Sequence, residues 1–480
     1  MSEALESGPA APAPRGRAPS KVPEPANPGG GTALAAVCLG FFMVLMDASA
    51  LNVALPRLRA ELGGGLAPLE WTVNSYTIAM AACLLGGGAL ADRLGARRLF
   101  ELSLLLFVAA SAACAASPGL GALIAARTVQ GVAAGGLLPA SLAVIAHMYP
   151  EPARRAKAFT IWGGVSSLAL VIGPVAGGAL TAAVGWRAIF LINVPIGLLA
   201  VAGCRRRLAP SPTRAVPLDP WGQLAAAVVV GCGIGALVEG GSHGWSAPLP
   251  LTLLGAAALA AVAFGLAERA ARHPVLPLGV LRRPGFAAGL GLGALFQFGA
   301  YGGQFALSLH LQHRWGLGAL GAGLAFVPFA SCWAFASFVL ARAVTRTGPR
   351  LLLIVGSAGA AAGALALLPL SGGRDWPLFT VGSCLLGLGA GLMGPSLPTV
   401  VLRSLPPDQS GLASGSLNAL RQVGGAIGVA LFGPLLDGRG DAGLRVCLAL
   451  VALGFAAAAL VVRHSMPAVT RARPADIRTT

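Results

Sequence analysis

Apolar segments about as long as a lipid bilayer is thick recur along this chain of 480 residues. A membrane-spanning helix needs about 20 apolar residues, each adding about 1.5 Å. Fourteen segments meet this requirement: 33–55, 70–91, 99–116, 120–146, 158–183, 188–204, 220–240, 249–267, 286–309, 319–341, 350–370, 377–402, 411–435 and 444–462. Because lipid offers no partners to backbone polar groups, each segment must be helical. The sequence therefore predicts an all-α integral membrane protein with 14 transmembrane helices.

Charge supports this fold class and indicates an orientation. Charged residues make up 11% of the chain, against roughly 25% in soluble domains. Of the 34 Lys and Arg residues, 25 fall on the side that holds both termini, seven on the other side, and two within segments. Cytoplasmic loops of membrane proteins are enriched in Lys and Arg. We therefore expect a multi-pass protein of the cell (plasma) membrane with cytoplasmic termini, and no binding of nucleic acid despite the net charge of +17.

Neither a metal site nor an enzyme is indicated. The eight Cys residues lie in apolar segments or at their ends, without a CxxC pair or a nearby His at metal spacing. His310 and His313 are three residues apart at a predicted helix end, which fits an interfacial polar pair better than a metal site. HExxH, nucleotide-binding and Gly-x-Ser-x-Gly motifs are all missing from the sequence. We expect no cofactor, and a receptor or membrane enzyme is the disfavoured alternative.

An internal repeat predicts two related halves. TRTGPR at 345–350 matches DRLGAR at 92–97 at an offset of 253 residues, and GLMGPSLP at 391–398 resembles GGLLPASL at 135–142. The segments at 220–240 and 249–267 fit neither copy, so we expect an inserted hairpin outside both bundles. The predicted organisation is a disordered cytoplasmic tail (1–31), a six-helix bundle (32–204), linkers with inserted helices 7 and 8 (205–285), a second six-helix bundle (286–462) and a cytoplasmic tail (463–480).

The stretch GGGALADRLGARR (86–98) resembles the signature loop of the major facilitator superfamily, G-x-L-a-D-R-x-G-r-[RK]-[RK]. The matching residues that we expect to form a cytoplasmic gating motif are Gly88, Asp92, Arg93, Gly95, Arg97 and Arg98. Gly95 permits a tight turn, while Ala96 replaces a usual basic residue. A helix N-terminus attracts an anion, so we expect Asp92 to contact the helix start near 408–411 when the cytoplasmic side is closed.

Further motifs resemble the fourteen-helix drug:proton antiporter branch of that superfamily, of the actinomycete antibiotic-resistance and export type. They are LMDASALNVALPRL (45–58), RTVQGVAAG (127–135), VIGPVAGG (171–178), WRAIFLINVPIG (186–197) and LNALRQVGGAIG (417–428). Ala48, Ser49 and Ala133 depart from the usual pattern. The resemblance implies that Gly173, Pro174, Gly177 and Gly178 form the antiporter motif, which marks exporters in the family. Small residues at these spacings also let helices approach closely.

Charges within the apolar segments point to function, because an unpaired ion in a membrane costs several kcal/mol. Asp47 is the only acid expected deep within a segment, and Arg127 and Arg421 are the deep cations. We expect Asp47 and Arg127 to face one cavity, where the carboxylate exchanges protons and the guanidinium adjusts its affinity for them. The alternative is a static buried ion pair that holds two helices together.

Polar residues at helical spacing suggest a substrate surface. Gln297, Tyr301 and Gln304 share one predicted helix face, and Asn418 and Arg421 lie on another. One interpretation is a central cavity lined by both faces, and the other is hydrogen bonding between helices. For Arg421, substrate binding is favoured.

The resemblance implies a proton-driven efflux transporter that exports a small, partly hydrophobic, antibiotic-like compound by alternating access. The alternative is a proton symporter for uptake of a small organic solute. We expect a monomer in the lipid bilayer, with protons and a small molecule as its ligands. One deep acid against two deep Arg residues favours neutral or anionic substrates over dications, because an unpaired buried cation is costly.

Overall fold

The structure is a computed structural model that describes residues 30–214, 217, 219–271, 274, 276–339, 348–406 and 409–465. The described residues form helices joined by short turns, with no strand among them. The predicted tails at 1–31 and 463–480 lie almost wholly outside the described residues. The all-α prediction is confirmed over the described chain.

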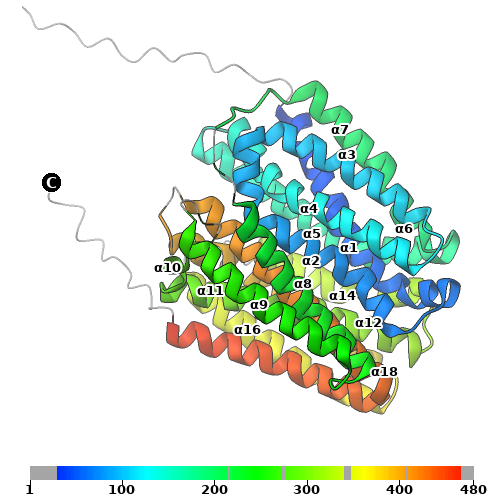
Figure 1. Cartoon of the computed structure of the whole chain (residues 1–480). Coiled ribbons are helices and arrows are strands. Elements are labelled where there is room, and N and C mark those ends of the chain that lie inside the picture. Colours follow the sequence, from blue (N-terminus) through cyan, green and yellow to red (C-terminus); the bar gives the residue numbers. More distant parts are fainter. Residues whose placement is uncertain are drawn as a thin grey trace, which may run out of the picture.

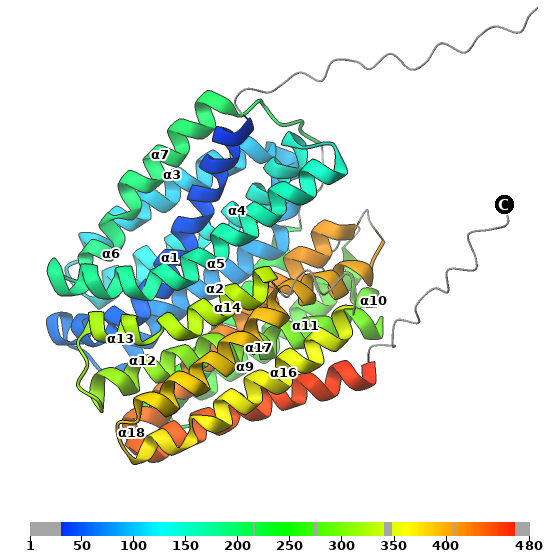
Figure 2. The same cartoon turned by 180° about the vertical axis from the view of Figure 1, so that it is seen from behind.

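The first half of the chain packs as one group of helices, coloured from blue through cyan to the green of α7 in Figure 1 and seen from behind in Figure 2. Its helices are α1 (Gly30–Leu62), α2 (Leu66–Leu94), α3 (Ala96–Ala115), α4 (Leu120–Met148), α5 (Pro152–Ala183), α6 (Arg187–Leu191) and α7 (Asn193–Arg207). α2 packs on α4, α1 on α5 and α7, and α3 on α4 and α7. We call these helices the first bundle.

The second bundle contains α11 (Pro284–Gln297), the π-helix η1 (Phe298–Gly302), α12 (Gly303–His313), α13 (Ala319–Ala325), α14 (Val327–Val339), α16 (Pro349–Ala366), the 3₁₀ helix η3 (Leu368–Gly372), α17 (Trp376–Arg403) and α18 (Ser410–Ser465). The short helix α10 (Leu278–Leu281) precedes it. Within α18, Gly440 has φ 51° and ψ −119°. This kink divides α18 into two spans, Ser410–Asp437 and Arg439–Ser465.

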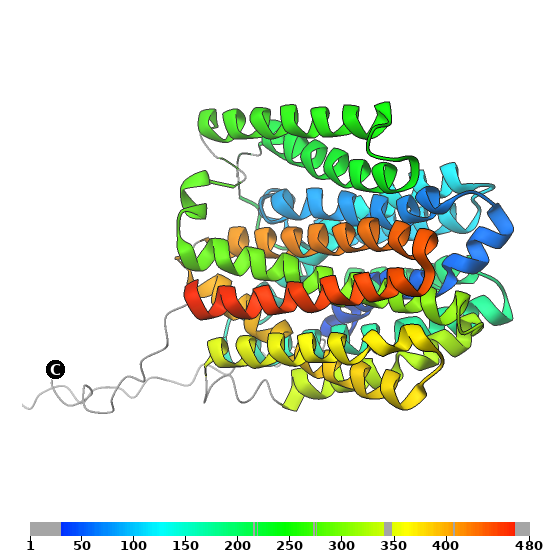
Figure 3. The ribbon, with the colours of Figure 1, turned by 90° about the horizontal axis from the view of Figure 1, so that it is seen from below.

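The helices α8 (Pro220–His243) and α9 (Pro248–Ala270) form a hairpin at one edge of the molecule (Figure 3). α8 packs against α2 of the first bundle and α18 of the second. In the most apolar stretch of α9 only 6% of the residues are buried, which suits a helix that faces lipid. The hairpin thus lies beside both bundles, and the exact domain boundaries stay a prediction.

Twelve helical segments among the described residues are long and apolar enough to cross a membrane. α5 and the interrupted run Pro284–His313 are further helical segments outside that count, so the predicted total of 14 stays a prediction. Helices extend beyond the predicted apolar segments. For example, α1 begins at Gly30 and ends at Leu62, because hydropathy marks the apolar stretch of a helix and not its polar ends.

Successive membrane-spanning segments run in opposite directions, so the molecule has two ends. We call them the Gly30 end, where α1 begins, and the Leu62 end, where α1 ends. Towards the Leu62 end the bundles meet through α5 and α13 with almost no side chain between them. A Cβ atom on Gly178 would lie 2.5 Å from the carbonyl oxygen of Ala319, and one on Gly323 would collide with the carbonyl group of Pro174. Glycine at both positions allows this close approach.

Replacing Gly178 with Val should lower the free energy of unfolding by about 1–3 kcal/mol, because the added atoms meet the α13 backbone, which cannot move aside as a side chain can. The measurement is unfolding of the purified protein in detergent. Gly255→Val in α9 is the matched control, because a Cβ atom there meets nothing within 4 Å. Equal stability of the two variants would contradict the close approach of α5 and α13.

Candidate functional site

Asp47 and Arg127 form an ion pair in the interior of the first bundle. Arg127 Nη1 donates to Asp47 Oδ2 at 2.6 Å, and the two side chains are 1% and 0% exposed. The guanidinium also stacks on the Tyr76 ring, with its carbon 4.1 Å from the ring centroid, and Nε donates to the Thr72 carbonyl at 3.2 Å. The pair therefore ties α1 to α4 and rests on α2.

Three uncharged polar residues complete the surroundings of this pair. Gln130 Nε2 and Asn193 Nδ2 donate to Asp47 Oδ1 at 3.2 and 2.8 Å. Gln130 Oε1 accepts from Arg127 at 2.6 Å, and Ser111 Oγ accepts from Gln130 at 2.8 Å. We call these five buried residues the Asp47 cluster. Gln130 and Asn193 lie in motifs quoted above, but nothing in those motifs distinguishes them from their neighbours.

The Asp47 cluster lies one residue from the contact between the bundles. Tyr301 in η1 donates from its hydroxyl to the Ala48 carbonyl at 2.8 Å. Their separation of 253 residues equals the offset of the sequence repeat, so the two halves touch through equivalent positions. Ser308 makes a similar bond to the Asn52 carbonyl at 3.3 Å. A shift of α1 that changes the Asp47 cluster would therefore also act on the second bundle.

The predicted substrate residues separate into distinct places. Gln297 and Arg421 are neighbours, with Arg421 Nη2 3.4 Å from Gln297 Oε1, and the guanidinium lies over the Phe296 ring at 5.1 Å. Gln304 instead lines a small pocket inside the second bundle, and Asn418 donates to a carbonyl of its own helix. The π-helix between Gln297 and Gln304 changes the helical register that the sequence spacing assumed.

Arg421 has an unusual environment for a cation. Among the described residues, Arg421 forms no ion pair with a carboxylate, and its buried Nε has no hydrogen-bond partner. A guanidinium has five N–H donors that need acceptors. Arg421 therefore has the capacity to bind an acceptor-rich or anionic group at this position.

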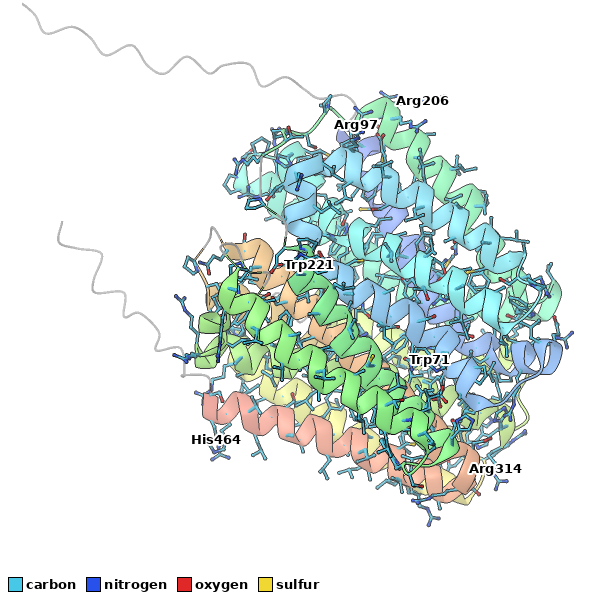
Figure 4. All side chains as sticks on the ribbon, in the orientation of Figure 1. Trp71, Arg97, Arg206, Trp221, Arg314 and His464 are labelled. Carbon is cyan, nitrogen blue, oxygen red and sulfur yellow. The ribbon has the colours of Figure 1, made fainter. Side chains whose placement is uncertain are left out.

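The loop motif lies at the Gly30 end, near Arg97 in Figure 4. Gly95 has φ 84°, which fits its predicted role in a tight turn. Arg97 donates to the carbonyl groups of Leu208 and Arg205 at 2.5 and 3.2 Å and pairs with Glu101 at 2.8 Å. Among the described residues, Arg93 and Arg98 make no polar side-chain contact, and a Cβ atom on Gly88 would meet nothing within 4 Å. The motif thus holds the segment that follows α7.

The predicted contact of Asp92 with the start of α18 stays a prediction, because residues 407–408 lie outside the described chain. The Asp92 side chain is exposed, and its carbonyl accepts from the Arg214 backbone N–H at 2.8 Å.

The antiporter motif in α5 has two packing faces. Cβ atoms on Gly173 and Gly177 would collide with Ser49 and Ala50 of α1, while Gly178 and the Pro174 carbonyl face α13 of the second bundle. The motif therefore joins the segment of α1 that carries Asp47 to the contact between the bundles.

The Leu62 end is rich in ionic and aromatic contacts. Arg314, labelled in Figure 4, forms a two-point ion pair with Asp441 at 2.5 and 2.9 Å, and the hydrogen bond to Asp441 raises the pKa of Arg314. His310 is buried and packs edge-on against Trp315, and His313 borders a small pocket between α1, α2 and α12. No metal-binding group of three or more His, Cys, Asp or Glu residues occurs in the part of the chain that the structure describes.

Two buried acids that lie near helix ends, Glu70 and Glu268, were not singled out from the sequence. Glu70 lies in the second turn of α2 and is 0% exposed. The predicted segment began at Glu70 itself, which made this residue look terminal. The helix begins four residues earlier, at Leu66, so the carboxylate lies inside the packed helices.

Comparison with known proteins agrees with this arrangement. The family model described as Major Facilitator Superfamily matches residues 37–429. The chain belongs to this superfamily. It is therefore a multi-pass membrane transporter, as the loop motif at 86–98 predicted.

Two relatives match almost end to end. The methylenomycin A resistance protein of Bacillus subtilis (strain 168) is 34% identical over 92% of this chain and 95% of its own. The cephamycin export protein CmcT of Amycolatopsis lactamdurans is 35% identical over 93% of this chain and 94% of its own. Among solved structures, the human organic anion transporter MFSD10 (TETRAN) superposes with a TM-score of 0.63 at 19% identity, over 90% of this chain and 99% of that one. The two relatives support the antibiotic-resistance and export branch, and the solved structure supports the fold.

Replacing Arg127 with Ala should destabilise the protein by about 3–5 kcal/mol, because Asp47 loses the cation that compensates its burial. The double variant Arg127→Ala, Asp47→Asn should recover part of this loss, since it removes the orphaned charge. Thermal unfolding of both purified variants in detergent gives the comparison. If the double variant unfolds no later than the single one, the pair does not stabilise the bundle through charge.

Proposed function

We propose that this transporter is a proton-driven exporter of small, partly hydrophobic, antibiotic-like compounds. The observation that carries the proposal is the Asp47 cluster, a buried acid beside the contact between the two bundles. The names of the relatives, which refer to antibiotic resistance and export, support export over uptake. The energy source is the proton gradient, so the cycle requires no cofactor.

We further propose that the Gly30 end is cytoplasmic and that the protein works as a monomer in the cell membrane. The excess of Lys and Arg in the loops of the Gly30 end supports this orientation. In the described conformation the Leu62 end, which is then extracellular, is closed by α5 against α13.

Coupling follows from the bonds of the Asp47 cluster. In the described conformation the Asp47 carboxylate accepts from Arg127, Gln130 and Asn193. A proton on the carboxyl group removes the charge that holds Arg127 and turns one acceptor into a donor. Asp47 is then freed from α4, and α1 moves relative to α5 and Tyr301. Proton binding is thereby linked to the arrangement of the two bundles, as exchange of protons for substrate requires.

Arg421 is the group that we propose for substrate binding. It lies beside Gln297 and Phe296, which add a polar and an aromatic surface. The charges of Asp47 and Arg127 cancel each other, so the charge of Arg421 is left uncompensated. This favours substrates that bring acceptors or a negative charge.

Asp47→Asn should abolish export that depends on the pH gradient, because Asn keeps the size of the side chain but cannot carry the proton. The measurement uses inverted membrane vesicles with an acidified lumen, in which addition of a transported antibiotic dissipates the gradient. Glu151→Gln, an exposed acid at the start of α5, is the matched control and should export normally. Undiminished gradient-dependent export by Asp47→Asn would refute the assignment.

Substrate preference should follow the charge of Arg421. Expressed in a susceptible host that lacks its own pumps, the protein should protect against neutral or acidic antibiotics and give little protection against bis-cationic biocides. Arg421→Gln should lower protection against acidic compounds more than against neutral ones, because only the ionic attraction is lost. Strong protection against bis-cations alone would contradict the role of Arg421 and leave export standing.

A further inference from the structure

Glu70 has the features of a second functional carboxyl group, away from the Asp47 cluster. Its side chain is 0% exposed, and neither carboxyl oxygen has a hydrogen-bond partner among the described residues. It lies against α18 of the second bundle, where a Cβ atom on Gly433 would collide with Glu70 Oε1. Its neighbour Trp71 appears in Figure 4, where α2 passes α8.

Among the residues that the structure describes, the helices around Glu70 offer it no free arginine or lysine. The charged or titratable groups that the packed helices present toward this region are Arg59 of α1, Arg127 of α4, Glu239 and His243 of α8, His313 of α12 and Asp437 of α18. Both arginines among them already have an acidic partner, and His243 lies beside an acid of its own helix. Arg59 lies 3.6 Å from Asp437, His243 lies 3.0 Å from Glu239, and Arg127 pairs with Asp47. The nearest other acids, Glu239 and Asp437, repel a negative charge on Glu70.

These surroundings suit only the neutral form of the side chain. A carboxylate buried without a partner costs several kcal/mol, so such a group instead holds a proton. The free-energy cost of ionising Glu70 depends on whether the two bundles are closed against each other, because the contact between Glu70 and Gly433 joins them. When the bundles separate at the Leu62 end, this contact opens to water, where a carboxyl group is ionised at neutral pH.

We propose that Glu70 is a second proton-binding site, at the interface of the two bundles, and that this end closes only when Glu70 carries a proton. The proposal rests on the proposed function for the assignment of the Leu62 end to the outside. Glu70 takes its proton from the external side when the end closes and returns it to the same side when the end opens. It therefore carries no proton across the membrane and sets the dependence of closure on external pH.

The test is the distance between spin labels on Val184 and Arg374, exposed positions at the Leu62 end of the first and second bundle. The eight natural cysteines are replaced, and the protein is measured in lipid nanodiscs at pH 6 and pH 8. In the parent chain the ratio of closed to open molecules should fall by up to about tenfold per pH unit, once the pH is high enough for Glu70 to ionise in the open state. Glu70→Gln should stay closed at both pH values, because Gln cannot ionise.

Two variants control the experiment. Glu70→Asp should keep a response to pH, since it still titrates. Glu151→Gln, an exposed acid at the opposite end of the molecule, should respond as the parent chain does. Export by the natural-cysteine chain, measured at several pH values with a constant gradient, should fall at high pH in the parent, whereas the export rate of Glu70→Gln, whatever its absolute value, should not depend on pH.

The proposal is overturned if Glu70→Gln opens with pH as the parent does, or if the parent distance does not respond to pH. Asp47→Asn separates this result from the proposed function. A response that survives in Asp47→Asn and disappears in Glu70→Gln supports Glu70 as the site, whether or not Asp47 couples export to protons. A response lost in Asp47→Asn but kept in Glu70→Gln assigns it to Asp47 and overturns the proposal.

Discussion

The buried ion pair between Asp47 and Arg127 is the interaction around which the first bundle is arranged. Two charges removed from water are tolerable only when their remaining hydrogen-bonding groups are satisfied. Gln130, Ser111 and Asn193 meet that need from α4, α3 and α7. The pair thus requires four helices to meet at one depth in the membrane.

The same short segment of α1 serves three contacts. Asp47 points into the first bundle, the carbonyl of Ala48 receives the Tyr301 hydroxyl, and Ser49 and Ala50 lie against the glycines of α5. Gly178 of α5 packs directly against α13. A movement of this segment of α1 therefore affects the second bundle both through Tyr301 and through α5. A change of charge at Asp47 can therefore alter the contacts between the two bundles through residues adjacent to it in α1.

Much of this could be predicted from the sequence. Apolar length located the helices, because lipid leaves the backbone no alternative, and scarcity of charge singled out Asp47, Arg127 and Arg421. The remaining features of the site could not be predicted, because the spacing of residues along the sequence does not show helix irregularities, exact helix starts or contacts between helices. The π-helix at Phe298–Gly302 changed the register of Gln304, the helix start four residues before Glu70 hid that acid, and Gln130 and Asn193 acquire a role only where helices meet.

The central claim is that substrate binding is linked to the release of a proton from Asp47 through the arrangement of the two bundles. It is tested most directly by adding a transported antibiotic to the purified protein in a weakly buffered detergent solution and recording the pH with an indicator dye. The account predicts that the natural protein releases protons as it binds the antibiotic, and that Asp47→Asn binds the antibiotic without releasing any. Equal proton release by both proteins would contradict it.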